Sequence, residues 1–136
     1  LVIDAPKVSD DLMITNDLVE LKSDTEFKWL GRYDSIINSG GIKLIPEVVE
    51  EKLSEVINQR FFISGIPDEQ LGEKVVLVVE LESIKVEKLK SVILNEVKNL
   101  TTLTKYEIPK EIYFVKSFVE TKTKKIQREK TLDLLF

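Results

Sequence analysis

The chain has 136 residues, a formal net charge of -4, and no cysteine or histidine. This length suits one domain with a hydrophobic core, or one small domain with part of another. Without cysteine and histidine there is no disulfide, thiolate nucleophile, histidine general base or histidine-containing zinc site, so the chemistry must use Lys, Arg, Asp, Glu, Ser, Thr or Tyr.

The first part of the chain predicts two β-hairpins and a helix. Residues 18–31, LVELKSDTEFKWLG, place apolar residues on both sides of a Ser-Asp turn. In residues 35–46, SIINSGGIKLIP, Gly40 and Gly41 separate two apolar runs, and glycine adopts positive φ there at little cost. Pro46 suits the first position of a helix, because that amide is unpaired anyway. An apolar stripe at helical spacing follows: Val49, Leu53, Val56 and Ile57.

The second part of the chain predicts a sheet with a further helix. Residues 60–67 and 74–82 are apolar, β-branched runs separated by turn residues, which indicates neighbouring core strands. Residues 85–100 have the apolar spacing of an amphipathic helix, and residues 111–118 predict another strand. Residues 131–136 predict a short helix or tail. The order of elements predicts an α+β fold, a small mixed or antiparallel sheet with helices packed on one face. The least packed join is expected at Gly-Arg-Tyr-Asp, between the two hairpins.

A basic segment stands near the end of the chain. Residues 118–130, FVETKTKKIQREK, include five Lys or Arg. Such a cluster is a solvated face, a grip for a polyanion, or the holder of one functional lysine. The acidic net charge argues against a general nucleic-acid binder.

The N-terminus and the hydropathy predict a cytoplasmic protein. No apolar run approaches the roughly 18 residues of a transmembrane helix. The first residues, LVIDAPKVSDD, lack the features of a signal peptide. They also lack an initiator methionine, which favours a piece of a longer protein.

An ordered series of motifs covers nearly the whole chain: TNDLVEL, WLGRYDSIINSGGIKLIPEVVEEKL, GIPDEQLGEKVVLVVE, YEIPKEIYFV and ETKTKKIQR. The series resembles the end of the adenylate-forming enzymes, the family of the acyl-CoA synthetases. That family's pattern runs T-G-D, G-R-x-D, a glycine-rich hairpin ending in P-x-x-[IV]-E, G-x-P-D-x-x-x-G, P-x-x-[IVF]-x-[FV] and T-x-x-G-K-[IV]-x-R. The hairpin NSGGIKLIP is most similar to the o-succinylbenzoate-CoA ligases of menaquinone biosynthesis.

The resemblance implies a two-domain enzyme of which this chain is one end. Residues 1–33 would be a β-hairpin tail of a large N-terminal ATP-binding domain, and residues 34–136 a mobile C-terminal lid. Asp34 would be the hinge between them. The whole enzyme would use ATP, Mg2+ and CoA to convert a small carboxylic acid into an acyl-adenylate and then a thioester. Its partners would be its own N-terminal domain, the acid and CoA, with no nucleic acid and no membrane. The isolated chain would bind no Mg2+ and be inactive.

The resemblance also implies roles for single residues. Asp17 would bind the ribose hydroxyls of ATP, and Arg32 would act near the same ribose. Gly40 and Gly41 would line the channel for the pantetheine arm of CoA. Lys125 would be the catalytic residue, bridging the carboxylate substrate and the α-phosphate. No residue is implied as a metal ligand.

The chain departs from the family pattern at two positions. Asn16 replaces the glycine of T-G-D, which is a mild change because asparagine tolerates left-handed backbone. Lys124 replaces the glycine before the catalytic lysine, and a site that needs positive φ would strain it. Lys122, Lys124 and Arg128 are interpreted as electrostatic support for Lys125 in recruiting ATP.

A different class of function stays open at this point. The chain could be a non-catalytic α+β binding module whose basic loop holds an acidic partner or RNA. A phosphate-binding loop in the sequence upstream of Leu1 would favour the ligase, and its absence would favour the binding module.

Overall fold

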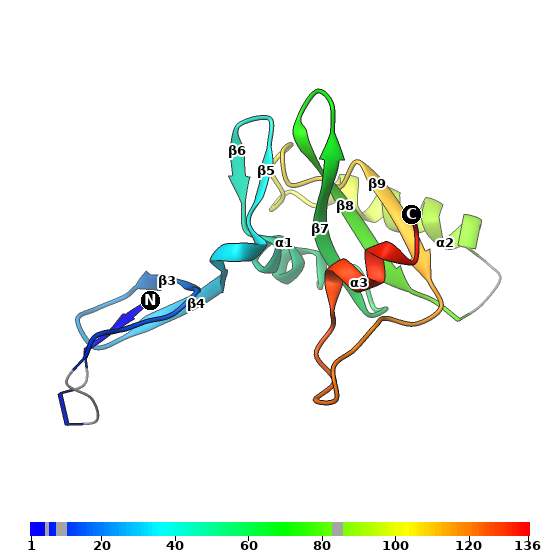
Figure 1. Ribbon diagram of the computed structural model, residues 1–136. Coiled ribbons are helices and arrows are strands. Elements are labelled where there is room, and N and C mark those ends of the chain that lie inside the picture. Colours follow the sequence, from blue (N-terminus) through cyan, green and yellow to red (C-terminus); the bar gives the residue numbers. More distant parts are fainter. Residues whose placement is uncertain (5, 8–10, 83–85) are drawn as a thin grey trace.

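The computed structural model describes residues 1–4, 6–7, 11–82 and 86–136. Figure 1 shows an arm, residues 1–32, that projects from a sheet with its helices. The predicted hairpin between residues 18 and 31 lies in this arm. The arm consists of two antiparallel strand pairs, β1 (Val2–Ile3) with β2 (Met13–Ile14) and β3 (Asp17–Leu21) with β4 (Phe27–Arg32).

The main sheet has five strands and is mixed, as the sequence predicts. β8 is its centre, because it pairs antiparallel with β7 and β5 and parallel with β9. β6 completes the sheet by pairing with β5 across the Gly40-Gly41 turn. The strands are β5 (Ile37–Ser39), β6 (Ile42–Leu44), β7 (Phe61–Asp68), β8 (Gly72–Glu80) and β9 (Glu111–Val115).

Helices cover both faces of this sheet (Figure 1). On one face, Val75, Leu77 and Val79 of β8 pack with the apolar stripes of α1 (Pro46–Leu53) and α2 (Val86–Asn99). On the other face, Val76 and Val78 pack with Phe62, Phe118 and Leu132 of α3 (Arg128–Asp133). Burial on both faces explains why β8 is a continuous apolar run. The prediction that all helices lie on one face is therefore wrong for α3.

Several element boundaries differ from the predicted ones. α1 ends at Leu53, and the amides of Val56 and Ile57 both donate to the Leu53 carbonyl in the turn that follows. α3 begins at Arg128, inside the basic segment rather than after it. The predicted start of α2 at residue 85 lies outside the described residues. In the part of the chain that the structure describes, no helix is long and apolar enough to cross a bilayer.

The join between arm and sheet is more tightly packed than predicted. Gly31 is buried, and a Cβ atom there would lie 2.4 Å from Glu47 Oε2 and 2.7 Å from Ile45 Cγ2. The arm therefore packs directly against the start of α1. A single 3₁₀ turn, η1 (Tyr33–Ser35), then leads into β5.

Candidate functional site

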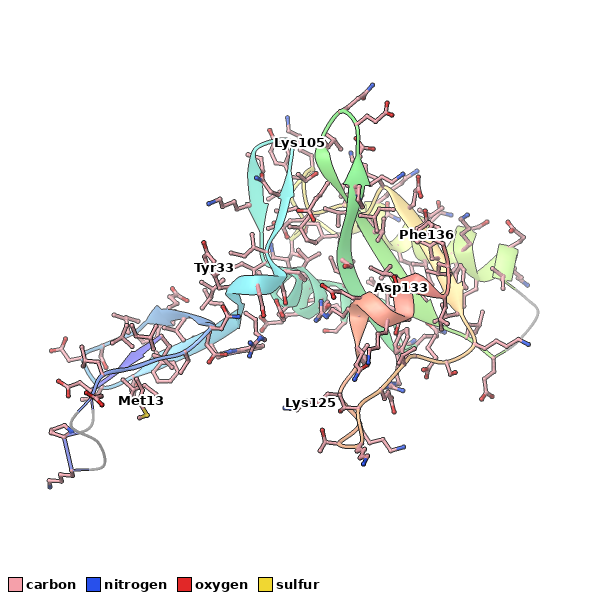
Figure 2. The ribbon with its side chains drawn as sticks, viewed as in Figure 1. Met13, Tyr33, Lys105, Lys125, Asp133 and Phe136 are labelled. Carbon is pink, nitrogen blue, oxygen red and sulfur yellow. The ribbon has the colours of Figure 1, made fainter. Side chains whose placement is uncertain are left out.

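Lys125 lies in a tight hairpin loop between β9 and α3 (Figure 2). Glu120 and Ile126 form the β-bridge at its base. At the turn, the Thr121 amide donates to the Lys125 carbonyl at 2.8 Å, and the Lys125 amide donates to Thr121 Oγ1 at 3.1 Å. The backbone around Lys125 is thus fixed on both sides by the side chain and main chain of Thr121.

Lys124 takes the left-handed conformation that the family's glycine would suit. Its φ is +66°, and among the described residues no other non-glycine residue has positive φ. A three-residue hairpin loop commonly ends in one left-handed residue, which glycine occupies at least cost. Lys124 therefore has the positive φ for which strain was anticipated, and Lys125 is the next residue along the chain.

The lysines of the loop are exposed and unpaired. Within the described part of the chain, Lys122, Lys124 and Lys125 form no ion pair, and all three are exposed. Their ammonium groups are free to meet an anion. The turn itself is fixed, so Lys125 is a mobile side chain on a defined backbone.

Arg128 does not belong to this exposed group, which corrects its predicted role as electrostatic support. Its side chain is half-buried, with Nη1 2.7 Å from Glu50 Oε1 and also donating to the Ile63 carbonyl at 2.7 Å. Its guanidinium lies 5.7 Å from the centre of the Phe62 ring. Its charge is largely compensated by Glu50. The sequence carries no signal for this pair, because its members are 78 residues apart.

Burial dominates the electrostatics of Glu50. The loss of water raises the pKa of its carboxyl above the ordinary value, although Arg128 and the Ile63 amide, which donates at 2.8 Å, both favour the charged form. Glu47 adds a second negative charge nearby, with Oε1 3.8 Å from Arg128 Nη2. Glu47 Oε2 is buried and has no hydrogen-bond partner among the described residues.

Three predicted site residues lie close together where the arm ends. Asp17 and Arg32 are register partners across β3 and β4, and Arg32 Nε lies 3.3 Å from Asp34 Oδ1. The Trp29 indole donates to Asp17 Oδ1 at 3.1 Å, and this bond lowers the pKa of the Asp17 carboxyl. The hydrogen bond from Arg32 to Asp34 likewise raises the pKa of the guanidinium. Asp17 and Arg32 are therefore both ionised, and they present opposite charges side by side at the end of the arm.

An open groove of about 560 Å³ lies between the end of the arm, at Arg32 and Asp34, and the segment after Lys125. One wall contains Arg32, Asp34 and Glu47, and the other contains residues 126–130. Neither Asp17 nor Lys125 lines it. The groove shows that the predicted hinge and the base of the lysine loop face each other.

The Gly40-Gly41 hairpin does not line this groove and lies away from the other predicted site residues (Figure 1). Gly40 and Gly41 have φ of +59° and +82°, and the Gly40 amide donates to the Leu71 carbonyl at 2.8 Å. In Figure 1 this turn lies at the opposite end of the sheet from the loop of Lys125. No group of three or more acidic, histidine or cysteine side chains able to hold a metal occurs in the described ranges.

The comparisons with known proteins agree with the motifs and the fold. No family model matches the chain. The human mitochondrial acyl-coenzyme A synthetase ACSM2A is 34% identical over 135 residues, which are 95% of this chain and 23% of that protein. The structure of an acyl-CoA synthetase (AMP-forming)/AMP-acid ligase II-like protein from Dyadobacter fermentans is 36% identical, with a TM-score of 0.69 over 93% of this chain and 36% of that one. The chain matches the C-terminal region of the AMP-forming acyl-CoA synthetases.

The chain spans less than a quarter of the length of the curated relatives that it matches. The o-succinylbenzoate CoA synthetase of Bacillus subtilis, solved with its acyl-adenylate intermediate, has a TM-score of 0.68 over 89% of this chain and 24% of that one. At 21% identity that likeness shows the shared fold alone.

Proposed function

We propose that this acyl-CoA synthetase chain is the C-terminal part of an ATP-dependent acid–CoA ligase, and that Lys125 carries its first half-reaction. Residues 1–33 would be the tail of the large ATP-binding domain and residues 34–136 the mobile lid. The observation that supports this most directly is Lys125 itself, an exposed and unpaired ammonium on a fixed turn, at the position that the family motif assigns to the catalytic lysine.

The charge of Lys125 suits adenylation. A carboxylate oxygen of the acid attacks the α-phosphorus of ATP, the bond from that phosphorus to the pyrophosphate oxygen breaks, and pyrophosphate leaves. Attack by one anion on another is slow unless a cation offsets the repulsion and the charge that builds on the phosphoryl oxygens. In the second half-reaction, the CoA sulfur loses its proton, attacks the acyl carbon and displaces AMP. That step needs no cation at the α-phosphate, so Lys125 is dispensable there.

The other residues divide between the two half-reactions. Asp17, kept ionised by its hydrogen bond from Trp29, would accept from the ribose hydroxyls of ATP, with Arg32 beside it. Rotation at Asp34 would then remove Lys125 and bring the turn of Gly40 and Gly41 to the active site, to line the pantetheine channel. The positions of the lysine loop and the glycine turn at opposite ends of the sheet suit such an exchange. Mg2+ would accompany ATP on the N-terminal domain.

For the acid, we propose o-succinylbenzoate, and with it a role in menaquinone biosynthesis in the cytoplasm. Support comes from the hairpin NSGGIKLIP, which is most similar to that of the o-succinylbenzoate-CoA ligases. Assaying the full-length ligase with o-succinylbenzoate, medium-chain fatty acids and benzoate tests this. The substrate with the highest kcat/KM identifies the acid class, and a fatty-acid preference would overturn this part of the proposal.

The decisive experiment for the ligase is Lys125→Ala in the full-length protein. Adenylation, measured as ATP–pyrophosphate exchange, should fall by about 10²- to 10³-fold, because one contact to transition-state charge is lost. Thioester formation from supplied acyl-adenylate should persist. Lys122→Ala, an exposed lysine of the same loop, is the matched control and should lower exchange only slightly.

Two outcomes would contradict the assignment. If Lys124→Ala abolishes exchange and Lys125→Ala does not, the catalytic lysine is Lys124. If neither has an effect, the alternative of a binding module whose basic loop holds an acidic partner or RNA gains support. The isolated chain should show no exchange with any acid, because the phosphate-binding loop would lie in the N-terminal domain.

A further inference from the structure

Arg128 joins three separate parts of the fold. Nη1 contacts Glu50 of α1 at 2.7 Å and the Ile63 carbonyl of β7 at 2.7 Å, and Nη2 donates to Glu50 Oε2 at 3.2 Å. Glu50 in turn accepts from the Ile63 amide at 2.8 Å. Arg128 itself is the first residue of α3, so this Glu50–Arg128 pair connects α1, β7 and α3 through two side chains.

The same point of the chain holds the base of the lysine loop. The Gln127 amide donates to the Val119 carbonyl at 2.8 Å, and the Val119 amide donates to Thr131 Oγ1 at 3.0 Å. Thr131 is fully buried and also donates to the Gln127 carbonyl. Both strands of the loop therefore end at the first turn of α3, which the Glu50–Arg128 pair fixes to the sheet.

The chemistry of the pair suits positioning more than net stability. A half-buried ion pair gains little over apolar packing, because both charges lose water, but removing one partner leaves the other uncompensated. The guanidinium donates hydrogen bonds to one carboxylate oxygen and to a carbonyl, and it lies 2.7 Å from the other carboxylate oxygen. An ammonium cannot reproduce this planar arrangement. Glu47 adds a second negative charge at 3.8 Å. The arrangement defines the orientation of α3 and hence of the loop.

We infer that the Glu50–Arg128 pair is a positioning device for Lys125. It fixes the loop of residues 119–127 relative to α1 and β7, so that the ammonium of Lys125 reaches the α-phosphate at a reproducible place during adenylation. Arg128 and Glu50 contact no substrate themselves. The catalytic consequence rests on the proposed function, whereas the fixing of the loop does not.

The first test measures the loop directly, by amide hydrogen exchange of this chain. In Arg128→Gln, the Thr121 and Gln127 amides should exchange at least about 10-fold faster relative to the Leu77 amide of central β8, because the loop opens locally. Glu50→Gln keeps an acceptor for the Ile63 amide but loses the charge, and it should also speed the exchange of the Thr121 and Gln127 amides. Arg128→Lys should lie between Arg128→Gln and wild type.

The matched control is Lys52→Gln. Lys52 Nζ lies 2.7 Å from Glu107 Oε2, and the two side chains are 29% and 10% exposed, close to the 25% and 20% of Arg128 and Glu50. That pair connects α1 to the turn that includes Lys105. In Figure 2 this turn lies at the opposite end of the sheet and its helices from Lys125. Lys52→Gln should leave the relative exchange of Thr121 and Gln127 unchanged.

The second test uses the full-length ligase at equal folded fraction. Arg128→Gln should slow adenylation by about 10- to 100-fold, the scale of a small misplacement of a catalytic group, and change thioester formation from supplied acyl-adenylate by less than about 3-fold. Unaltered loop exchange, or an equal fall of both half-reactions as in a merely destabilised protein, would overturn the inference. If Lys125→Ala leaves adenylation intact, the proposed function fails, while the exchange data still decide whether the pair fixes the loop.

Discussion

Replacing Lys124 with glycine should stabilise the protein, because Lys124 has φ of +66°. Left-handed backbone costs an L-residue about 1 to 2 kcal/mol, and glycine avoids that cost. Glycine also increases the freedom of the unfolded chain, which offsets about 0.4 to 1 kcal/mol. Lys124 is exposed and has no ion pair among the described residues, so its side chain contributes little. The net gain should be about 0.5 to 1 kcal/mol, or about 2 to 4 °C in Tm for a chain of this size.

Urea unfolding of three variants isolates the backbone effect. Lys124→Ala removes the same charge but keeps the strained dihedral, so Lys124→Gly should exceed it in unfolding free energy. Lys122→Gly, in the same turn but without positive φ, should be destabilised by about 0.5 to 1 kcal/mol. If Lys124→Gly is no more stable than Lys124→Ala, the left-handed strain argued for this loop is absent.

Two further predictions concern the hinge and the buried carboxylate. If the full-length protein is the proposed ligase with a hinge at Asp34, Asp34→Pro should shift the ratio of the adenylation rate to the thioester-forming rate, because proline fixes φ and would hold one lid arrangement. Asp34→Ala removes the same ion pair with Arg32 without fixing φ, and an equal ratio in both variants would exclude a hinge at Asp34. Because the pKa of the Glu50 carboxyl is raised, the folded state binds the carboxyl proton more tightly than the unfolded chain does. The stabilisation that this proton provides is fully present below the ordinary pKa of 4.5, and it is lost as pH rises through the raised pKa. Relative to wild type, the unfolding free energy of Glu50→Gln should therefore increase as pH rises above 4.5, and a difference that is flat across urea titrations in that range would contradict the raised pKa.

The elements that could be predicted from the sequence are those marked by short local patterns of residues. The Gly40-Gly41 turn and Pro46 mark their elements through backbone geometry that few other residues supply, and both elements occur where expected. The apolar run of β8 predicts a core strand but not which helices cover each face, since both faces are apolar. The side of α3 is decided by packing against Phe62 and Phe118, which are distant in sequence.

In the candidate site, too, local motifs could be predicted from the sequence, whereas contacts between distant residues could not. The order of motifs predicts Lys125 as the catalytic lysine, and this stays a prediction. For Lys124, the sequence indicates strain only if the site needs positive φ, and the φ of +66° shows that it does. The partnership of Arg128 with Glu50 was not predicted, because a cluster of basic residues looks alike in sequence whether its members face water or the core. Only the tertiary fold brings α1 beside the start of α3 and turns one of the five cations inward.

The close contact of Gly31 with Glu47 has a consequence for the lid movement proposed above. In the proposed rotation at Asp34, Gly31 would move away from Glu47, and packing at the join would be lost. The same movement admits water to Glu47 Oε2, which here is buried without a hydrogen bond, and hydrating such an atom recovers about 1 to 3 kcal/mol. The gain from hydration opposes the loss of packing. On the proposed function, the buried Glu47 oxygen, which has no hydrogen bond among the described residues, lowers the free-energy cost of leaving the present arrangement. Glu47→Gln or Gly31→Ala should therefore shift the equilibrium between the two proposed lid arrangements.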